Sequence, residues 1–134
     1  MVSHGTMAEG MYNAAKMVFG NLPDVSYLCL TEEKDIETFR GELGILLEES
    51  DREKPVTVLC DISGGSPYNT MLELLAKTGD LDRARVVSGM NLPLLLLVLA
   101  AGDSSRETVK RCAEEAQGSL QLFEMQCGGN EEEL

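Results

Sequence analysis

The chain of 134 residues has the length of one ordinary domain, and 43% of its residues are hydrophobic, enough for a core. A formal net charge of −12 argues against nucleic acid and anionic membrane surfaces as partners; it suits either docking on a basic protein or well-solvated helix faces. No signal peptide is visible, and the longest apolar stretch, residues 92–101, is too short to span a bilayer, so a cytoplasmic location is expected.

The four cysteines form no CxxC motif, and the chain has a single histidine. These two features predict reduced, mostly buried thiols and no metal site.

Segments typical of strands and of helices alternate along the chain. A short apolar stub ends at His4, and a helix follows it whose start is marked by Thr6 and Glu9 as a capping box. Ser66 is expected to cap a later helix, with Pro67 at its first position. The elements after the first helix are expected in this order: a strand over 25–30, a helix over 36–47, a strand over 56–60, a helix over 68–75, a strand over 85–88, an apolar helix over 92–101, a helix over 109–116 capped by Ser104 and Glu107, and a last strand over 120–125.

This order predicts an α/β fold with three layers, a mostly parallel sheet between two layers of helices. Residues 1–126 are expected to form the single domain, and residues 127–134 a disordered acidic tail. Only three residues precede His4, so either the first strand is a stub or the native start lies upstream. Sheets of this kind bind ligands at the carboxyl ends of their strands, near a topological switch point.

Two polar residues come at such strand ends, His4 after the first strand and Asp61 after the strand over 56–60. A carboxylate that accepts one ring N–H of a histidine fixes its tautomer and leaves the other nitrogen free to attack. We therefore predict that His4 is a nucleophile and that Asp61 orients it. A surface histidine and a turn aspartate are the ordinary alternatives for these residue types.

A glycine-rich turn follows Asp61 and leads into the next helix. Gly64 and Gly65 let the backbone approach an anion, and the helix after Pro67 adds a positive dipole end. Ser66 is a candidate donor to a phosphoryl oxygen, although capping the helix is the alternative role of its hydroxyl. Asn69 and Asn91 are expected to hold loops in place rather than to take part in catalysis.

Three runs together resemble one family: residues 3–10 (Ser-His-Gly-Thr-Met-Ala-Glu-Gly), residues 61–69 (Asp-Ile-Ser-Gly-Gly-Ser-Pro-Tyr-Asn) and residues 89–93 (Gly-Met-Asn-Leu-Pro). Their order and spacing resemble the enzyme IIA domain of the mannose family of the bacterial phosphoenolpyruvate-dependent sugar phosphotransferase system. The resemblance covers nearly the whole chain. It implies strand order 2-1-3-4 and a last, antiparallel strand, here residues 120–125, that is exchanged between two subunits of a homodimer.

The resemblance also implies a function. His4 would accept a phosphoryl group from the phosphocarrier protein HPr and pass it to a IIB component, which phosphorylates a sugar entering through the membrane subunits IIC and IID. Asp61 would orient His4, and Gly64, Gly65 and Ser66 would contact the phosphoryl group. Such a domain needs no cofactor and no metal.

The same residues have several alternative interpretations. A histidine phosphatase would need an arginine before His4 and a second histidine, and a hydrolase based on Ser66 lacks the Gly-x-Ser-x-Gly elbow. Two others stay open: the phosphotransfer subunit of a dihydroxyacetone kinase, and a non-catalytic, partner-binding module regulated by phosphorylation. The intact Gly-Gly-Ser-Pro and Asn-Leu-Pro runs favour the sugar system over the kinase.

Overall fold

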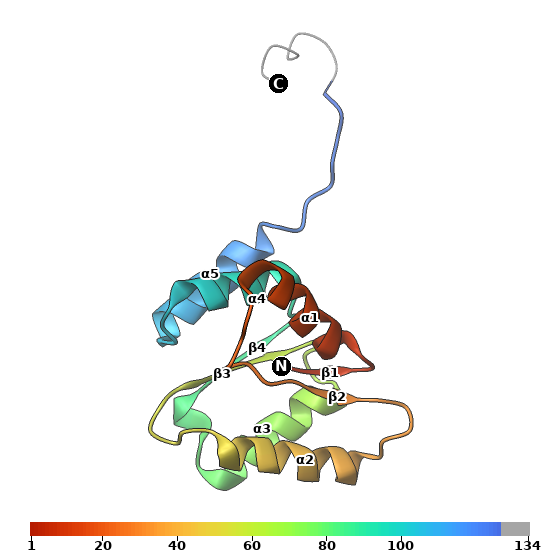
Figure 1. Ribbon diagram of the computed structural model, residues 1–134, viewed down its shortest axis with the longest axis vertical. Helices are drawn as coiled ribbons and strands as arrows, with labels where there is room; N and C mark the ends of the chain where they lie inside the picture. The colour runs from red at the N-terminus through yellow and green to blue at the C-terminus, as the bar shows by residue number, and fades with distance from the viewer. Residues whose placement is uncertain (127–134) are drawn as a thin grey trace.

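Four parallel strands form one sheet in the order β2-β1-β3-β4, in a computed structural model that describes residues 1–126. Helices α2 and α3 cover one face of the sheet, and α1, α4 and α5 cover the other (Figure 1). The predicted three-layer α/β/α fold and strand order are therefore confirmed. The elements are β1 (Val2–His4), α1 (Met7–Phe19), β2 (Leu28–Leu30), α2 (Ile36–Glu49), β3 (Val56–Cys60), α3 (Ser66–Thr78), a 3₁₀ turn η1 (Leu81–Arg83), β4 (Ala84–Ser88), α4 (Leu92–Ala101) and α5 (Arg106–Gln117).

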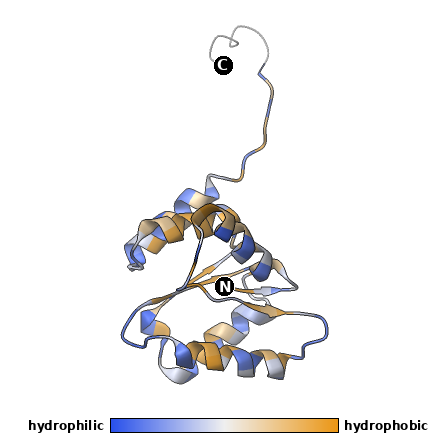
Figure 2. Cartoon of the chain, viewed as in Figure 1, coloured by the Kyte–Doolittle hydropathy of each residue, from blue (hydrophilic) through white to orange (hydrophobic). Residues whose placement is uncertain are grey.

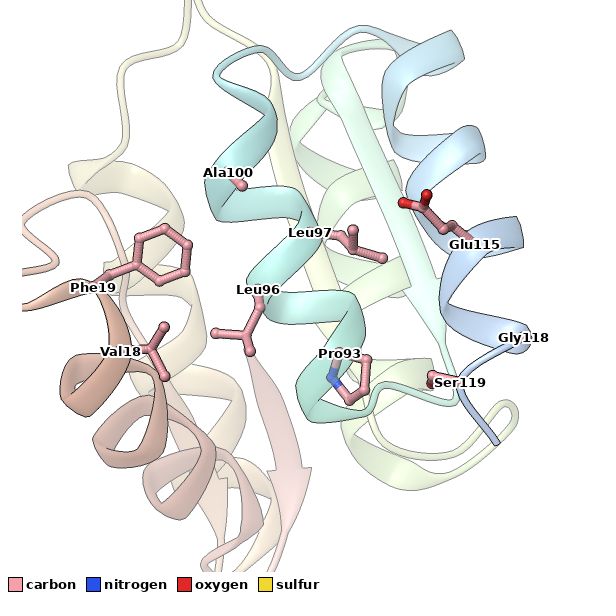
Figure 3. A pocket seen from close by; sticks show the side chains of 9 residues that line it. All are labelled: Val18, Phe19, Pro93, Leu96, Leu97, Ala100, Glu115, Gly118 and Ser119. Carbon is pink, nitrogen blue, oxygen red and sulfur yellow. The ribbon is translucent and has the colours of Figure 1, made fainter. Parts of the chain in front are cut away.

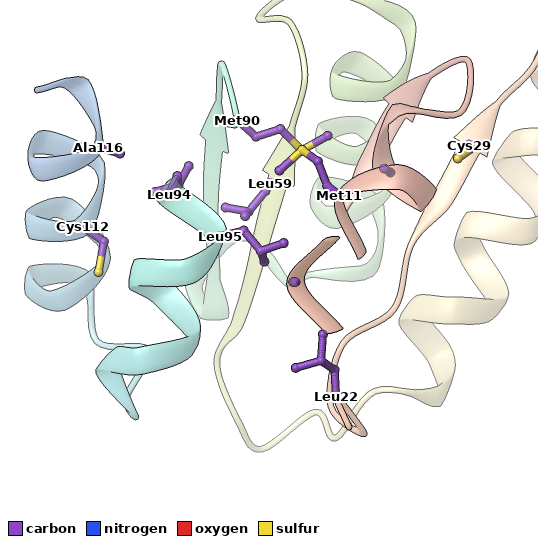
Figure 4. Packing of buried hydrophobic residues seen from close by; sticks show 11 residues of the cluster. Met11, Leu22, Cys29, Leu59, Met90, Leu94, Leu95, Cys112 and Ala116 are labelled. Carbon is purple, nitrogen blue, oxygen red and sulfur yellow. The ribbon is translucent and has the colours of Figure 1, made fainter. Parts of the chain in front are cut away.

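The core lies in two layers, one on each face of the sheet. Hydrophobic residues gather on the strands and along the helices beside them, whereas the outer loops are hydrophilic (Figure 2). Figure 4 shows the layer beneath α1, α4 and α5, which consists of Ala8, Met11, Ala15, Leu22, Cys29, Leu59, Met90, Leu94, Leu95, Cys112 and Ala116. The opposite layer, beneath α2 and α3, consists of Val2, Phe39, Leu43, Leu47, Val58, Cys60, Met71, Leu75 and Ala84.

The second strand is shorter than the predicted 25–30. Pairing is confined to Leu28–Leu30, because β2 lies at the sheet edge and its one neighbour, β1, has three residues. Before it, Val25 closes a turn by donating its N–H to the carbonyl of Leu22. A ladder cannot extend beyond the strand that it pairs with.

Three predicted helix caps are wrong. Thr6 has backbone angles φ −101° and ψ 16° and makes no capping bond; the oxygen of Ser3 takes the amide of Ala8 instead. Gly65, not Ser66, is the N-cap of α3, so Ser66 is the first residue of that helix. The N-cap of α5 is Ser105, one residue after the predicted Ser104, and its hydroxyl accepts from the Thr108 N–H.

The stretch that follows α5 has no regular secondary structure within this single chain, from residue 119 to residue 126. The side chains of Leu120, Leu122, Phe123 and Met125 are all largely exposed there. Pairing of residues 120–125 with a second subunit stays a prediction. The expected acidic tail, residues 127–134, lies outside the described residues.

The predicted buried thiols are found for Cys29, Cys60 and Cys112, whereas Cys127 lies beyond residue 126. Burial raises the pKa of the Cys60 thiol to about 11. Within residues 1–126, no helix combines the length and the apolar character that crossing a bilayer requires.

Candidate active site

The site lies at the topological switch point of the sheet. β1 and β3 are neighbours, but the chain leaves β1 toward β2 and leaves β3 toward β4, on the other side. A crevice between diverging connections at the carboxyl ends of strands is where such folds bind ligands. His4 ends β1 and Asp61 follows β3 directly, so the two residues meet at this point.

His4 and Asp61 form a close pair, as the sequence predicts. The imidazole Nδ1 lies 2.8 Å from Asp61 Oδ2, and the backbone N–H of His4 donates to the same oxygen at 2.8 Å. The other carboxylate oxygen, Oδ1, accepts the N–H of Ile62 at 2.8 Å. The side chain of His4 is 46% exposed and that of Asp61 only 6%. The aspartate therefore contacts the imidazole from its buried side, and the other side of the imidazole faces solvent.

The carboxyl of Asp61 is held in its ionised form. Burial acts to raise its pKa, but the hydrogen bonds from the backbone and ring of His4 and from Ile62 outweigh burial and hold the pKa below its usual value. An ionised carboxylate accepts but cannot donate, so Nδ1 carries the ring proton. The lone pair of the neutral imidazole is then on Nε2, the nitrogen turned away from Asp61.

Gly65 lies against the edge of the imidazole. A Cβ atom at this position would stand 2.8 Å from His4 Cε1 and 3.5 Å from Nε2. The backbone of Gly65 has φ −76° and ψ 167°, which any residue can adopt, so glycine is required here by space and not by conformation. The missing side chain lets the start of α3 approach the ring.

The start of α3 presents amide groups next to this ring. The first bond within the helix runs from the Asn69 N–H to the Gly65 carbonyl at 2.9 Å, so the amides of Ser66 and Tyr68 have no acceptor within the helix, and Pro67 has no N–H. The positive end of the helix dipole adds to them. These are the features by which helix N-termini bind anions.

The turn between Asp61 and α3 is braced internally. The side-chain amide of Asn69 donates to the Gly64 carbonyl at 2.9 Å, and Gly64 itself has φ +81°. The Gly65 N–H donates to the Ile62 carbonyl at 3.3 Å. The loop-holding role predicted for Asn69 is confirmed. Asn91 acts likewise, since its side chain accepts the Leu94 N–H at the start of α4.

A broad apolar groove lies away from this site, over the outer side of α4. Its volume is about 590 Å³, and Figure 3 shows the residues that line it: Val18, Phe19, Pro93, Leu96, Leu97, Ala100, Glu115, Gly118 and Ser119. The groove contains neither His4 nor Asp61. Among residues 1–126, no three His, Cys, Asp or Glu side chains are grouped so that they could hold a metal ion.

The fold and the site define a small α/β domain with an exposed histidine, held by a carboxylate and facing a helix N-terminus. The family model EIIA-man, described as "PTS system fructose IIA component", matches residues 1–117. The chain therefore belongs to the mannose-type enzyme IIA family of the sugar phosphotransferase system.

Named relatives come from several bacteria. The mannose-specific EIIAB component of Escherichia coli strain K12 is 30% identical over 101 residues, which are 75% of this chain and 30% of that protein. The fructose-specific EIIA component of Bacillus subtilis is 30% identical over 97 residues, 72% of this chain and 64% of that protein. The aligned part thus spans less than two thirds of either relative. The mannose/sorbose-specific IIA subunit from Enterococcus faecalis superposes with a TM-score of 0.82 at 25% identity, covering 96% of this chain and 95% of that one.

Proposed function

We propose that this protein is a phosphoryl carrier of a bacterial sugar phosphotransferase system, and that His4 Nε2 accepts the phosphoryl group from phospho-HPr. The observation that carries the proposal is the pairing of His4 Nδ1 with Asp61 Oδ2 at 2.8 Å, with nearly half of the ring exposed. A carrier histidine must be reachable by another protein and must keep one nitrogen unprotonated. Family membership supports the same role.

The transfer is a direct displacement. The Nε2 lone pair attacks the phosphorus of phospho-HPr, the P–N bond to the HPr histidine breaks, and the electron pair returns to that histidine. His4 becomes cationic when the new P–N bond forms, and the Asp61 carboxylate at Nδ1 stabilises this charge. Because one phosphohistidine replaces another, the step is reversible, as a relay requires.

The phosphoryl oxygens are received by the turn before α3 and by its first residues. The amide and hydroxyl of Ser66 and the turn at Gly64 are the donors we assign, and Gly65 gives the close approach. Since Gly65 is the N-cap, the hydroxyl of Ser66 is not needed as the cap. Hydrogen bonds from these amides and the hydroxyl would stabilise the negative charge of the phosphoryl oxygens without a metal ion or a cofactor.

The acceptor is a IIB component, which phosphorylates a sugar taken up through the membrane subunits IIC and IID. The named relatives serve mannose and fructose systems, and this supports a sugar relay rather than a dihydroxyacetone kinase subunit. The cytoplasm is the compartment in which HPr and IIB meet such a carrier.

We further infer a homodimer that exchanges residues 120–125. Within residues 1–126, β4 is an edge strand whose one neighbour is β3, so its other edge is open to a further strand. In the stretch after α5, Leu120 is 90% exposed, Leu122 83% and Phe123 84%. A run of exposed apolar side chains of this kind is typical of a surface that another protein chain covers. An antiparallel strand from a second copy would cover both features.

A two-stage transfer experiment tests the relay. The protein is loaded with phosphoenolpyruvate, enzyme I and catalytic HPr, freed of small molecules, and mixed with a purified IIB domain of the mannose family. Loss of the phosphoryl mass from this protein with matching gain by IIB is the expected result. Loading without any onward transfer to IIB domains of mannose, fructose and sorbose systems would instead favour a regulated binding module.

A further inference from the structure

The residue just before the histidine has an unusual environment for its type. Ser3 is fully buried, with 0% exposure, in the middle of β1. It pairs with Cys29, whose side chain lies in the hydrophobic layer beneath α1. Side chains alternate along a strand, and Val2 belongs to the opposite layer, so Ser3 faces α1. A hydroxyl in such a layer is costly unless it is hydrogen-bonded.

The hydroxyl of Ser3 has one specific partner. Its Oγ accepts the backbone N–H of Ala8 at 2.8 Å, and Ala8 is also fully buried. Ala8 is the second residue of α1, so its amide is one of those that a helix leaves without an internal acceptor. Ser3 thereby acts as the cap that Thr6, at the N-cap position, does not provide.

The bond between Ser3 and Ala8 closes a short loop of the chain that contains the histidine. The chain between its two ends is His4, Gly5, Thr6 and Met7, the turn that carries the imidazole. Besides the bond of the imidazole to Asp61, the turn has two other backbone anchors: the His4 N–H donates to Asp61, and the Gly5 N–H donates to the Leu30 carbonyl at 2.8 Å. Both anchors hold the strand end of the turn. Among the hydrogen bonds of residues 1–126, only the Ser3 bond ties the helix end of this turn back to β1.

We propose that Ser3 is a positioning residue for phosphoryl transfer, whose hydroxyl sets the turn from His4 to Met7 and through it the direction of the imidazole. This rests on the proposed carrier function of His4. Without the hydroxyl, the Ala8 amide is buried with no acceptor, and α1 shifts to give it one. The turn from His4 to Met7 moves together with α1, and this displaces His4 Nε2 relative to the start of α3.

The matched variants are Ser3→Thr and Ser3→Val, which add the same β-branched bulk but differ in the hydroxyl. Ser3→Ala removes the hydroxyl without added bulk. All are compared as full chains, at a temperature where circular dichroism shows each of them folded. The kinetic readout is the rate of phosphoryl acceptance from phospho-HPr, separated into kcat and KM. A second readout is the ¹⁵N NMR signal of the single imidazole, which reports the ring tautomer and its bond to Asp61.

Ser3→Thr should keep kcat within about twofold of the wild type. Ser3→Val and Ser3→Ala should lower kcat about tenfold, the effect of one lost hydrogen bond, with KM for HPr unchanged. Both should also shift the imidazole Nδ1 and Nε2 resonances toward a mixture of tautomers. Equal rates and equal imidazole spectra for Ser3→Thr and Ser3→Val would overturn the proposal.

The outcome is separable from that of the carrier function. If wild-type protein takes no phosphoryl group, the proposed function fails, but the imidazole spectra still decide whether Ser3 orients His4. If the wild type is phosphorylated and the hydroxyl-free variants lose activity only in proportion to their unfolded fraction, Ser3 stabilises the fold and does not position the histidine.

Discussion

One oxygen atom of Asp61 holds both the backbone and the side chain of His4. Oδ2 accepts the His4 N–H and lies within 2.8 Å of the ring Nδ1, while Oδ1 accepts the N–H of Ile62. The carboxylate therefore meets three donors with two acceptor atoms. Its position in the chain, one residue after β3, makes it a link between the two central strands as well as the partner of the histidine.

Asp61→Asn should be no milder than Asp61→Ala. Asparagine has one acceptor oxygen, so in either orientation its NH₂ group faces a backbone N–H, that of His4 or that of Ile62. It also lacks the charge that stabilises a cationic ring. We expect phosphoryl acceptance to fall by roughly a hundredfold in both variants, measured by rapid quench with phospho-HPr. Retention of the wild-type rate by Asp61→Asn would show that the carboxylate charge has no role.

Gly65→Ala should disable the histidine while leaving the fold intact. The added Cβ would stand 2.8 Å from His4 Cε1, which forces the ring away from the start of α3. We expect the transfer rate to drop at least about tenfold, since a displacement of about 1 Å has large effects on reaction rates. Gly41→Ala is the matched control, because a Cβ there meets nothing within 4 Å. Equal rates for the two variants would remove Gly65 from the site.

Shortening the chain should change the oligomeric state. A chain that ends after Ser119 lacks the exposed apolar stretch over residues 120–125 and should sediment as a monomer, whereas the full chain should sediment as a dimer. A chain that lacks only residues 127–134 is the control and should remain dimeric. A monomeric full chain at micromolar concentration would contradict strand exchange.

A prediction on stability concerns Asp80, which lies in the loop after α3, at the start of the 3₁₀ turn η1. The Thr78 hydroxyl, Arg83 and Arg52 all donate to its carboxylate, and together these bonds hold its pKa at about 2. A carboxyl whose pKa is lower in the folded state stabilises the fold above its unfolded pKa, about 3.9, and loses that contribution as the pH falls.

The free energy of unfolding should therefore decline between about pH 4 and pH 2, and Asp80→Asn should flatten this decline. Urea titrations across this range measure it. Asp82→Asn, at an exposed position two residues on, is the control and should leave the slope unchanged. An unchanged slope in Asp80→Asn would assign the acid sensitivity to other carboxyls.

The parallel sheet and the placing of His4 and Asp61 at one edge of it were predictable from periodicity, whereas the strand order came from the family resemblance. Apolar strands alternating with amphipathic helices determine a parallel sheet, and residues at the ends of neighbouring strands must lie at one edge. The loop-holding roles of Asn69 and Asn91 were equally accessible, since asparagine favours such turns and caps.

Periodicity does not predict contacts between segments far apart in the chain. It also does not predict which of several candidate residues caps a helix. Thr6 fits the capping-box pattern, yet the buried Ser3 takes the helix amide, because only the fold places its hydroxyl beneath α1. The closeness of Gly65 to the imidazole joins residues 61 positions apart, and a Gly-Gly pair is by itself only a turn signal. The one sequence signal for the role of Ser3 was its polar side chain within an otherwise apolar strand, shortly before the start of a helix.

The central claim is that His4 carries a phosphoryl group, and intact mass spectrometry tests it most directly. Wild type and His4→Ala are incubated with phosphoenolpyruvate, enzyme I and HPr, and each mass is recorded before and after mild acid. We predict the gain of one acid-labile phosphoryl group, about 80 Da, in the wild type only. An equal gain in His4→Ala, or no gain in the wild type while HPr itself is fully phosphorylated, would contradict the account.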